Sequence, residues 1–224
     1  MYVTCTFLTT FTQGLMVYYN LDTIKELILN IRTNHLFQVK CKNHLVIAEN
    51  TKKLLRCLYS IAFVLAGGTQ TFWSIKPYIQ GTRSLPTKAW YPFDYFKSPY
   101  FDITSIYQTI TSAYMIVHTI NVDVLIDDFI IIIGAQCDML RYTLQNLNHF
   151  ESIDGVLVER RAKIDCNDSG FVDVMSENMK ICIETYHEIK LLSKISQDMF
   201  HLGLFIVSLG GGVILCCILF QLLY

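Results

Sequence analysis

Four long runs of this chain contain no Asp, Glu, Lys or Arg, and this segregation of charge constrains the fold more than any other feature. The runs are Met1–Leu21, Cys57–Ile75, Ile103–Val122 and Met199–Tyr224. Each has about 20 residues or more, roughly the length that a helix needs to cross ~30 Å of hydrocarbon. One such run would fit a buried core helix. Four runs in 224 residues predict an all-α fold, a polytopic transmembrane helical bundle with four spans and the lipid bilayer as its surroundings.

The overall composition agrees with this prediction. Only 17% of the residues are charged, whereas soluble globular domains carry about a quarter. The net charge of −1 gives no indication of a nucleic-acid partner or of an anionic surface partner. The first residues lack the basic region and the cleavage site of a signal peptide. The chain therefore looks as if it enters a span partway or is truncated upstream.

The cysteines predict neither a disulfide framework nor a zinc site. The chain has eight of them, at Cys5, Cys41, Cys57, Cys137, Cys166, Cys182, Cys216 and Cys217. None lies in the segment that we expect outside the cell, Lys76–Asp102, and no CxxC pair occurs. We expect these thiols to act as small apolar side chains or to stay reduced in the cytosol.

Basic residues assign the two sides of the membrane. Asn20–Arg56 holds seven of them, Lys76–Asp102 holds four, and Arg141–His201 holds seven. The positive-inside rule then puts the first and third segments in the cytoplasm and the middle segment outside. A sequon at Asn167 falls on the cytoplasmic side, so we expect it to stay without glycan.

The resulting layout has seven segments. Spans occupy 1–21, 57–79 and 201–224, a cytoplasmic loop occupies 22–56, and an extracellular loop occupies 80–102. A long transmembrane helix with a cytoplasmic extension occupies 103–147, followed by a cytoplasmic loop and helix at 148–200.

The third run belongs to an unusually long helix. Its pattern continues to about Leu147 without Pro and with Gly134 as its one Gly. At 1.5 Å per residue this is roughly 68 Å, more than twice the hydrocarbon core. Asp123, Asp127 and Asp128 mark its exit from the membrane, since carboxylates at mid-bilayer cost a few kcal/mol. A cation site at Asp123 and Asp127 is the alternative.

Beyond this exit an apolar stripe, Phe129–Gly134, needs a protein partner. A predicted helix at Met175–Gln197 offers one, and its apolar residues at helical spacing are Met179, Ile183, Tyr186, Ile189 and Leu192. Between the two helices we expect Glu151–Gly170 to be irregular. In the last span, Gly210-Gly211-Gly212 allows either close packing or a hinge.

The expected outer loop carries the most specific pattern. It reads Leu85-Pro-Thr-Lys-Ala-Trp-Tyr-Pro-Phe-Asp94, then Ser98-Pro-Tyr100, followed by Tyr107-Gln108. Such a loop of aromatic and Pro residues suits a compact structure that folds back over a pocket. It resembles the second extracellular loop of insect odorant receptors. The long span that follows, with Asp123 inside it and an end like Gln136–Leu147, is also typical of that family.

Aligned in this way, the four spans look like the second to fifth of the family's seven. The first, sixth and seventh have no counterpart here, and the seventh lines the ion pathway in that family. The resemblance implies a ligand-gated cation channel that small volatile molecules open. It also implies a heterotetramer with a shared odorant receptor co-receptor, joined through the cytoplasmic helical ends, with the odorant bound in the outer half of each subunit.

Candidate ligand-binding residues follow from this orientation. Thr69, Phe72 and Trp73 share one face of the second span, and Tyr107, Thr111, Tyr114 and His118 form a stripe on the third. Thr6 and Thr10 are weaker candidates on the first span. Such stripes also serve helix–helix packing. A sparse set of hydroxyls on an apolar, aromatic wall suits a small hydrophobic ligand that binds by burial.

Other functions have less support in the sequence. Asp138-Met-Leu-Arg141-Tyr142 only loosely echoes the triplet of G-protein-coupled receptors, and a gustatory receptor would carry its hallmark in a last span that has no counterpart here. No nucleophile elbow, phosphate-binding loop, metalloprotease motif or pair of catalytic carboxylates is found. His118 has no second metal ligand at suitable spacing. The sequence predicts no enzyme activity, no cofactor and no metal site.

Overall fold

The structure is a computed structural model, and it describes residues 2–79, 85, 87, 89–95, 97, 99–153, 155–160 and 170–223. Within the outer loop, Pro86, Lys88 and Ser98 lie outside the described residues. Cys166 and the sequon at Asn167 also lie outside them.

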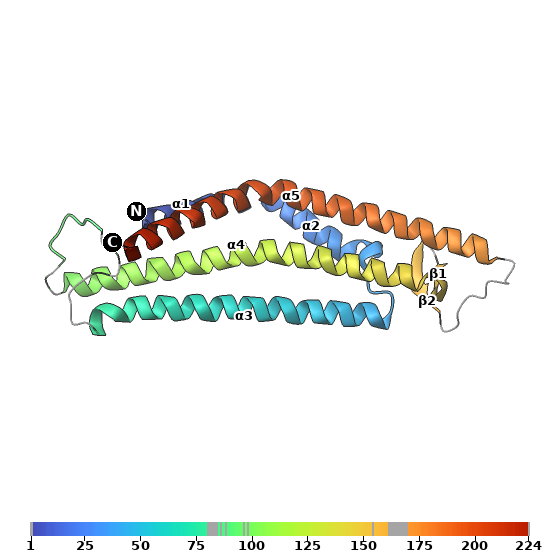
Figure 1. Cartoon of the computed structure of the whole chain (residues 1–224), viewed down its shortest axis with the longest axis horizontal. Coiled ribbons are helices and arrows are strands. Elements are labelled where there is room, and N and C mark those ends of the chain that lie inside the picture. The colour runs from blue at the N-terminus through green and yellow to red at the C-terminus, as the bar shows by residue number, and fades with distance from the viewer. Residues whose placement is uncertain are drawn as a thin grey trace. The chain divides into compact units, whose positions relative to one another are not determined.

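The described chain is helical over most of its length, which confirms the predicted all-α fold (Figure 1). The elements in chain order are α1 (Tyr2–Tyr19), α2 (Leu21–Thr33), η1 (His35–Phe37), α3 (Lys42–Ile79), α4 (Tyr100–Gln145), η2 (Leu147–His149), β1 (Phe150–Ile153), β2 (Val156–Glu159) and α5 (Phe171–Leu223). The third charge-free run lies in one uninterrupted helix, α4, of 46 residues, as its pattern predicted.

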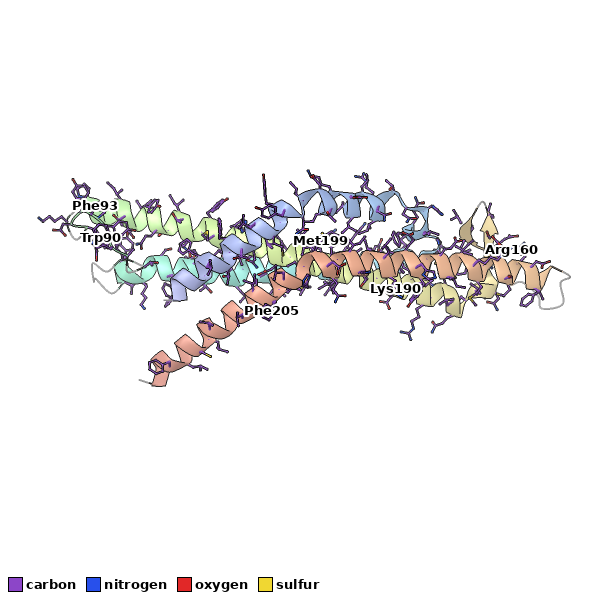
Figure 2. The ribbon with its side chains drawn as sticks, turned by 90° about the horizontal axis from the view of Figure 1, so that it is seen from above. Trp90, Phe93, Arg160, Lys190, Met199 and Phe205 are labelled. Carbon is purple, nitrogen blue, oxygen red and sulfur yellow. The ribbon has the colours of Figure 1, made fainter. Side chains whose placement is uncertain are left out.

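Helices α3 and α5 also join a charged segment to a charge-free run without a break. They have 38 and 53 residues. Figure 2 shows Met199 and Phe205 on the same ribbon of α5, on either side of the predicted start of the last span. Over the part of the chain that the structure describes, no helix has a stretch that is both long enough and apolar enough to count as a membrane span.

The chain divides into two compact units. Unit 1 comprises 1–17, 57–125 and 202–224, and unit 2 comprises 18–56 and 126–201. These divisions fall within a few residues of the ends of the charge-free runs. Each division between the units therefore lies near the start or the end of a charge-free run, whereas the charged segment 76–102 falls within unit 1.

In unit 1, α1 packs against α5 through two glycines. A Cβ atom on Gly203 would overlap Met16 Sδ, and one on Gly210 would overlap Thr9 Cγ2. The two contacts are seven residues apart on both helices, so they repeat along one seam. Between helices that offer few polar groups, such close approach supplies the dispersion contacts that hold them together. Gly210 therefore serves close packing, whereas no atom lies within 4 Å of a Cβ built on Gly211 or Gly212.

In unit 2, strands β1 and β2 form a hairpin that the sequence did not reveal. The strands are antiparallel, with Phe150 opposite Glu159 and Ile153 opposite Val156, and Gly155 has a φ of +75° in the turn. The expectation that Glu151–Gly170 is irregular was therefore wrong for its first part. A single short hairpin is too brief to give a clear alternating pattern, and tertiary contacts stabilise it.

The hairpin is held by burial and by one amide. Phe150 and Leu157 belong to a core cluster with Cys41, Leu147, Ile181 and Cys182. Asn178 of α5 is fully buried, and its Nδ2 donates hydrogen bonds to Phe150 O at 2.7 Å and to Leu147 O at 3.4 Å. Figure 1 shows the hairpin beside the end of α4 and the first turns of α5.

The buried face of α5 differs from the predicted one in its first half. Ile189 and Leu192 are buried as expected, but Met179, Ile183 and Tyr186 are exposed. The buried face instead holds Asn178, Ile181, Cys182, Thr185, Ile189, Leu192, Ser196, Met199 and Phe200. The apolar pattern misled because this face includes buried polar residues. Thr185 Oγ1, for example, donates a hydrogen bond to Ile181 O of the same helix. Phe129 does find a partner in Phe200, with the ring centroids 5.7 Å apart.

Gly210→Ala should loosen the seam between α1 and α5. The β-branched Thr9 has little freedom to move away from the new methyl group, so we expect a loss of about 1–3 kcal/mol in stability. The measurement is the Tm of the purified chain in detergent. Gly211→Ala is the matched control and should be neutral or slightly stabilising, because alanine favours the helix and meets no neighbour. Equal Tm values for the two variants would contradict the seam.

The stability of unit 2 should fall with acidification. Burial, and to a smaller extent the charge of Lys40, lowers the pKa of His44 below its ordinary value of 6.5. Below about pH 6.5 the His44 side chain is protonated in the unfolded chain but stays neutral in the folded chain. The free energy of unfolding is therefore highest above that pH and decreases as the pH falls through it. Tm should decrease between about pH 7 and about pH 5.5, and less steeply in His44→Gln. An unchanged slope in that variant would exclude His44 as the cause.

Candidate functional site

Unit 1 contains an open apolar pocket of about 680 Å³ between α1 and α4. It is lined by Phe7, Leu8, Thr10, Phe11, Gly14 and Leu15 of α1 and by Tyr114, Met115 and His118 of α4. Of these nine residues, five have purely apolar side chains and one is the glycine Gly14. Its size falls in the range of roughly 300–1,000 Å³ that is usual for sites of small molecules.

The wall on α1 arises from helical spacing. Phe7, Phe11 and Gly14 follow one another at intervals of four and three residues, so they lie on one face. Gly14 allows the imidazole of His118 to come close, because a Cβ at this position would lie 3.3 Å from both Cε1 and Nε2 of the ring. The glycine thus sets the distance between the two helices at this level of the pocket.

Two side-chain hydrogen bonds fasten α1 to α4 beside the pocket. Thr10 Oγ1 and Thr119 Oγ1 are 3.1 Å apart, and Gln13 Nε2 donates to Asp123 Oδ1 at 2.8 Å. Thr10 and Gln13 are both buried, with 4% and 3% of their surface exposed. Each satisfies a polar group that would otherwise be costly to bury. Asp123 therefore has a protein partner inside the bundle in addition to its place at the predicted exit.

The structure brings together only some of the predicted ligand-binding residues. Thr10, Tyr114 and His118 line the pocket. The others do not line it: Thr6, Thr69, Phe72, Trp73, Tyr107 and Thr111. Of these, Thr69 donates its hydroxyl to Leu65 O within its own helix, and Phe72 and Trp73 are exposed. Whether any of the nine touches a ligand stays a prediction.

Sequence reasoning missed most of the wall on α1. Phe7, Leu8, Phe11 and Leu15 of α1 line the pocket, as does Met115 of α4, although none of them was a candidate. The prediction favoured stripes that mix hydroxyls with aromatic rings, whereas this wall is almost purely apolar. A usable signal was present in Phe7 and Phe11, one helical turn apart and one turn before a lone glycine.

The described part of the outer loop is compact, and Gln108 of α4 holds it. Its amide accepts from the backbone N of Thr87 at 3.0 Å and donates to Thr87 O at 2.9 Å and to Tyr91 Oη at 3.0 Å. Tyr91 also contacts the ring of Phe93, with the centroids 5.4 Å apart. Figure 2 shows Trp90 and Phe93 next to the N-terminal end of α4. No described loop residue lines the pocket.

The lining of the pocket determines which kind of ligand it would suit. Apolar and aromatic walls with one hydroxyl, one phenol and one imidazole favour a small apolar ligand that has few polar atoms. Among the described residues, no three or more His, Cys, Asp or Glu side chains are grouped so that they could hold a metal ion.

Comparisons with known proteins agree on one family. A family model described as 7tm Odorant receptor matches residues 1–224. The Odorant receptor Or1 of Anopheles gambiae is 24% identical over 161 residues, which cover 68% of this chain and 38% of that protein. The solved structure of the insect olfactory receptor OR5 from Machilis hrabei is similar with a TM-score of 0.69 and 15% identity, over 96% of this chain and 52% of the other. This chain therefore spans about half of the length of these relatives or less.

Proposed function

The chain belongs to the 7tm odorant receptor family, a family of membrane receptors, and from that premise we propose that it is the ligand-sensing part of an odorant receptor subunit. It binds small volatile hydrophobic molecules and contributes to gating a cation channel together with a co-receptor. Since it spans 38% and 52% of its two relatives, the channel activity belongs to the whole protein in this proposal.

The observation that carries the proposal is the pocket between α1 and α4. Its volume of about 680 Å³ and its apolar lining suit a small ligand that has an apolar surface and few polar groups. Burying roughly 200 Å² of such a ligand contributes roughly 5 kcal/mol at about 25 cal/mol per Å². That is enough for a receptor that has to release its ligand again. The hydroxyl of Tyr114 and the ring of His118 add the few polar contacts that discriminate between ligands.

We further propose that the protein is a multi-pass protein of the plasma membrane. The four charge-free runs would be its spans, corresponding to the second to fifth of the family. The basic segments on either side of the second run would then face the cytoplasm and the outside, respectively.

Assembly with a co-receptor would use the cytoplasmic ends of the helices. In unit 2, α4 and α5 border an open groove of about 840 Å³. Its lining combines apolar residues such as Ile133 and Leu140 with the basic Arg141, Lys190 and Lys194, and Figure 2 shows Lys190 on α5. Ile183 and Tyr186 are exposed on the same helix. An apolar surface with a charged rim is typical of a protein contact.

Expression in cells tests the function directly. The complete receptor chain, expressed with a co-receptor, should give a cation current when small volatile apolar compounds are applied. The same chain without the co-receptor should give little or none. Absence of current for every compound in the paired cells, with surface expression confirmed by labelling, would contradict the proposal.

Side-chain truncation tests the pocket. Tyr114→Ala removes an aromatic wall and should weaken the response to the best ligand by roughly tenfold, which corresponds to about 1.4 kcal/mol of lost binding. It should also change the rank order of ligands. Trp73→Ala is the matched control, because it truncates a partly exposed aromatic residue in unit 1 that does not line the pocket. If Trp73→Ala had the larger effect, the ligand would bind elsewhere in the bundle.

A further inference from the structure

Unit 2 contains a buried histidine whose protonation state follows from its hydrogen bonds. His44, near the start of α3, is 2% exposed. Its Nε2 lies 3.1 Å from Thr143 Oγ1, and the Thr143 hydroxyl donates to Met139 O at 3.0 Å. A hydroxyl has one proton to donate, so Thr143 accepts and His44 Nε2 carries the hydrogen of their shared bond.

The second ring nitrogen is therefore left as an acceptor. Burial and the nearby charge of Lys40 lower the pKa of His44, which keeps the ring neutral. A neutral ring that is protonated at Nε2 has a free lone pair on Nδ1. This atom is buried, and no described residue donates to it. Buried polar atoms without a partner are rare and call for an explanation such as an ordered water.

A small cavity that His44 helps to line offers that explanation. It measures about 10 Å³, which is room for about one water molecule. His44 lines it, and the polar residues around it are Gln38, Lys40, Gln136, Thr143 and Thr185. An apolar cavity of this size would stay empty, but a water is stable where two to four polar partners surround it.

Thr185 supplies a second acceptor on another helix. Its hydroxyl donates to Ile181 O at 2.8 Å, so the lone pairs of Thr185 Oγ1 remain available. Two of the residues that line the cavity thus carry an acceptor with a free lone pair, His44 on α3 and Thr185 on α5. Water, with two hydrogens and this volume, complements them. A metal ion or ammonium does not, because the Lys40 side chain lines the same cavity.

We propose that this cavity is a buried water site, in which one molecule donates hydrogen bonds to His44 Nδ1 and Thr185 Oγ1 and so ties α3 to α5. The amide of Gln136 on α4 completes the shell. The bound water fixes the tautomer of His44 through Nδ1, and Thr143 does so through Nε2.

Nitrogen NMR of the histidine rings tests the bond to Nδ1. The chain is labelled with ¹⁵N-histidine in a lipid bilayer, and one of its six ring systems is assigned by its loss in His44→Gln. We expect a neutral ring protonated at Nε2, with the Nδ1 signal displaced in the direction that marks an accepted hydrogen bond. An Nδ1 signal at the position of a free acceptor, or protons on both nitrogens, would overturn the proposal.

A pair of valine variants tests the proposed hydrogen bond from the water to Thr185. Thr185→Val removes the acceptor at the cavity, and Thr51→Val is its control, since Thr51 Oγ1 also donates at 2.8 Å to the carbonyl four residues earlier but lies outside the cavity lining. With a water present, Thr185→Val should lower Tm by about 2–4 °C more than the control and move the Nδ1 signal of His44. In an empty cavity the added methyl would stabilise the protein, so a Tm equal to or above the control would refute the water site.

Discussion

The lack of charge along four segments is the constraint on which the rest of unit 1 depends. A segment that enters hydrocarbon has to satisfy every backbone N–H and C=O within itself, and a helix does so. Such helices then gain little from the hydrophobic effect when they meet, so close packing and isolated hydrogen bonds have to join them. The contacts between α1 and its neighbours are of these two kinds: Gly210 packs closely against Thr9, and Gln13 donates a hydrogen bond to Asp123.

The same contacts shape the pocket. Because Gly14 allows His118 to approach α1, the helices are held close at one level, while the bulky Phe7 and Phe11 border open space. A pocket formed in this way is apolar, because its walls are apolar faces of α1 and α4. Polar side chains such as Thr10 make hydrogen bonds between the helices. Under the proposed function, selectivity among ligands would rest mainly on the shape of the pocket, with Tyr114 and His118 as its few polar contributors.

In unit 2, directed hydrogen bonds between buried polar side chains contribute alongside apolar packing. The unit carries most of the charges of the chain, and its core contains polar side chains whose bonds are directed: Asn178 to two carbonyl groups, and His44 to Thr143. Directed bonds of this kind define one arrangement of helices more sharply than apolar burial does. They also make the unit sensitive to pH and to the loss of a single partner, because each buried polar atom is costly when it is left alone.

The sequence predicted the helical class and the continuous helix α4, because charge and proline act locally and can be read residue by residue. It also singled out Tyr114 and His118, which share a helical face. The folded structure alone shows which face of α5 is buried, that residues 150–159 form a hairpin, and that Phe7 and Phe11 line the pocket. Those outcomes depend on contacts between residues far apart in the chain, where a polar side chain such as Asn178 can be fully buried.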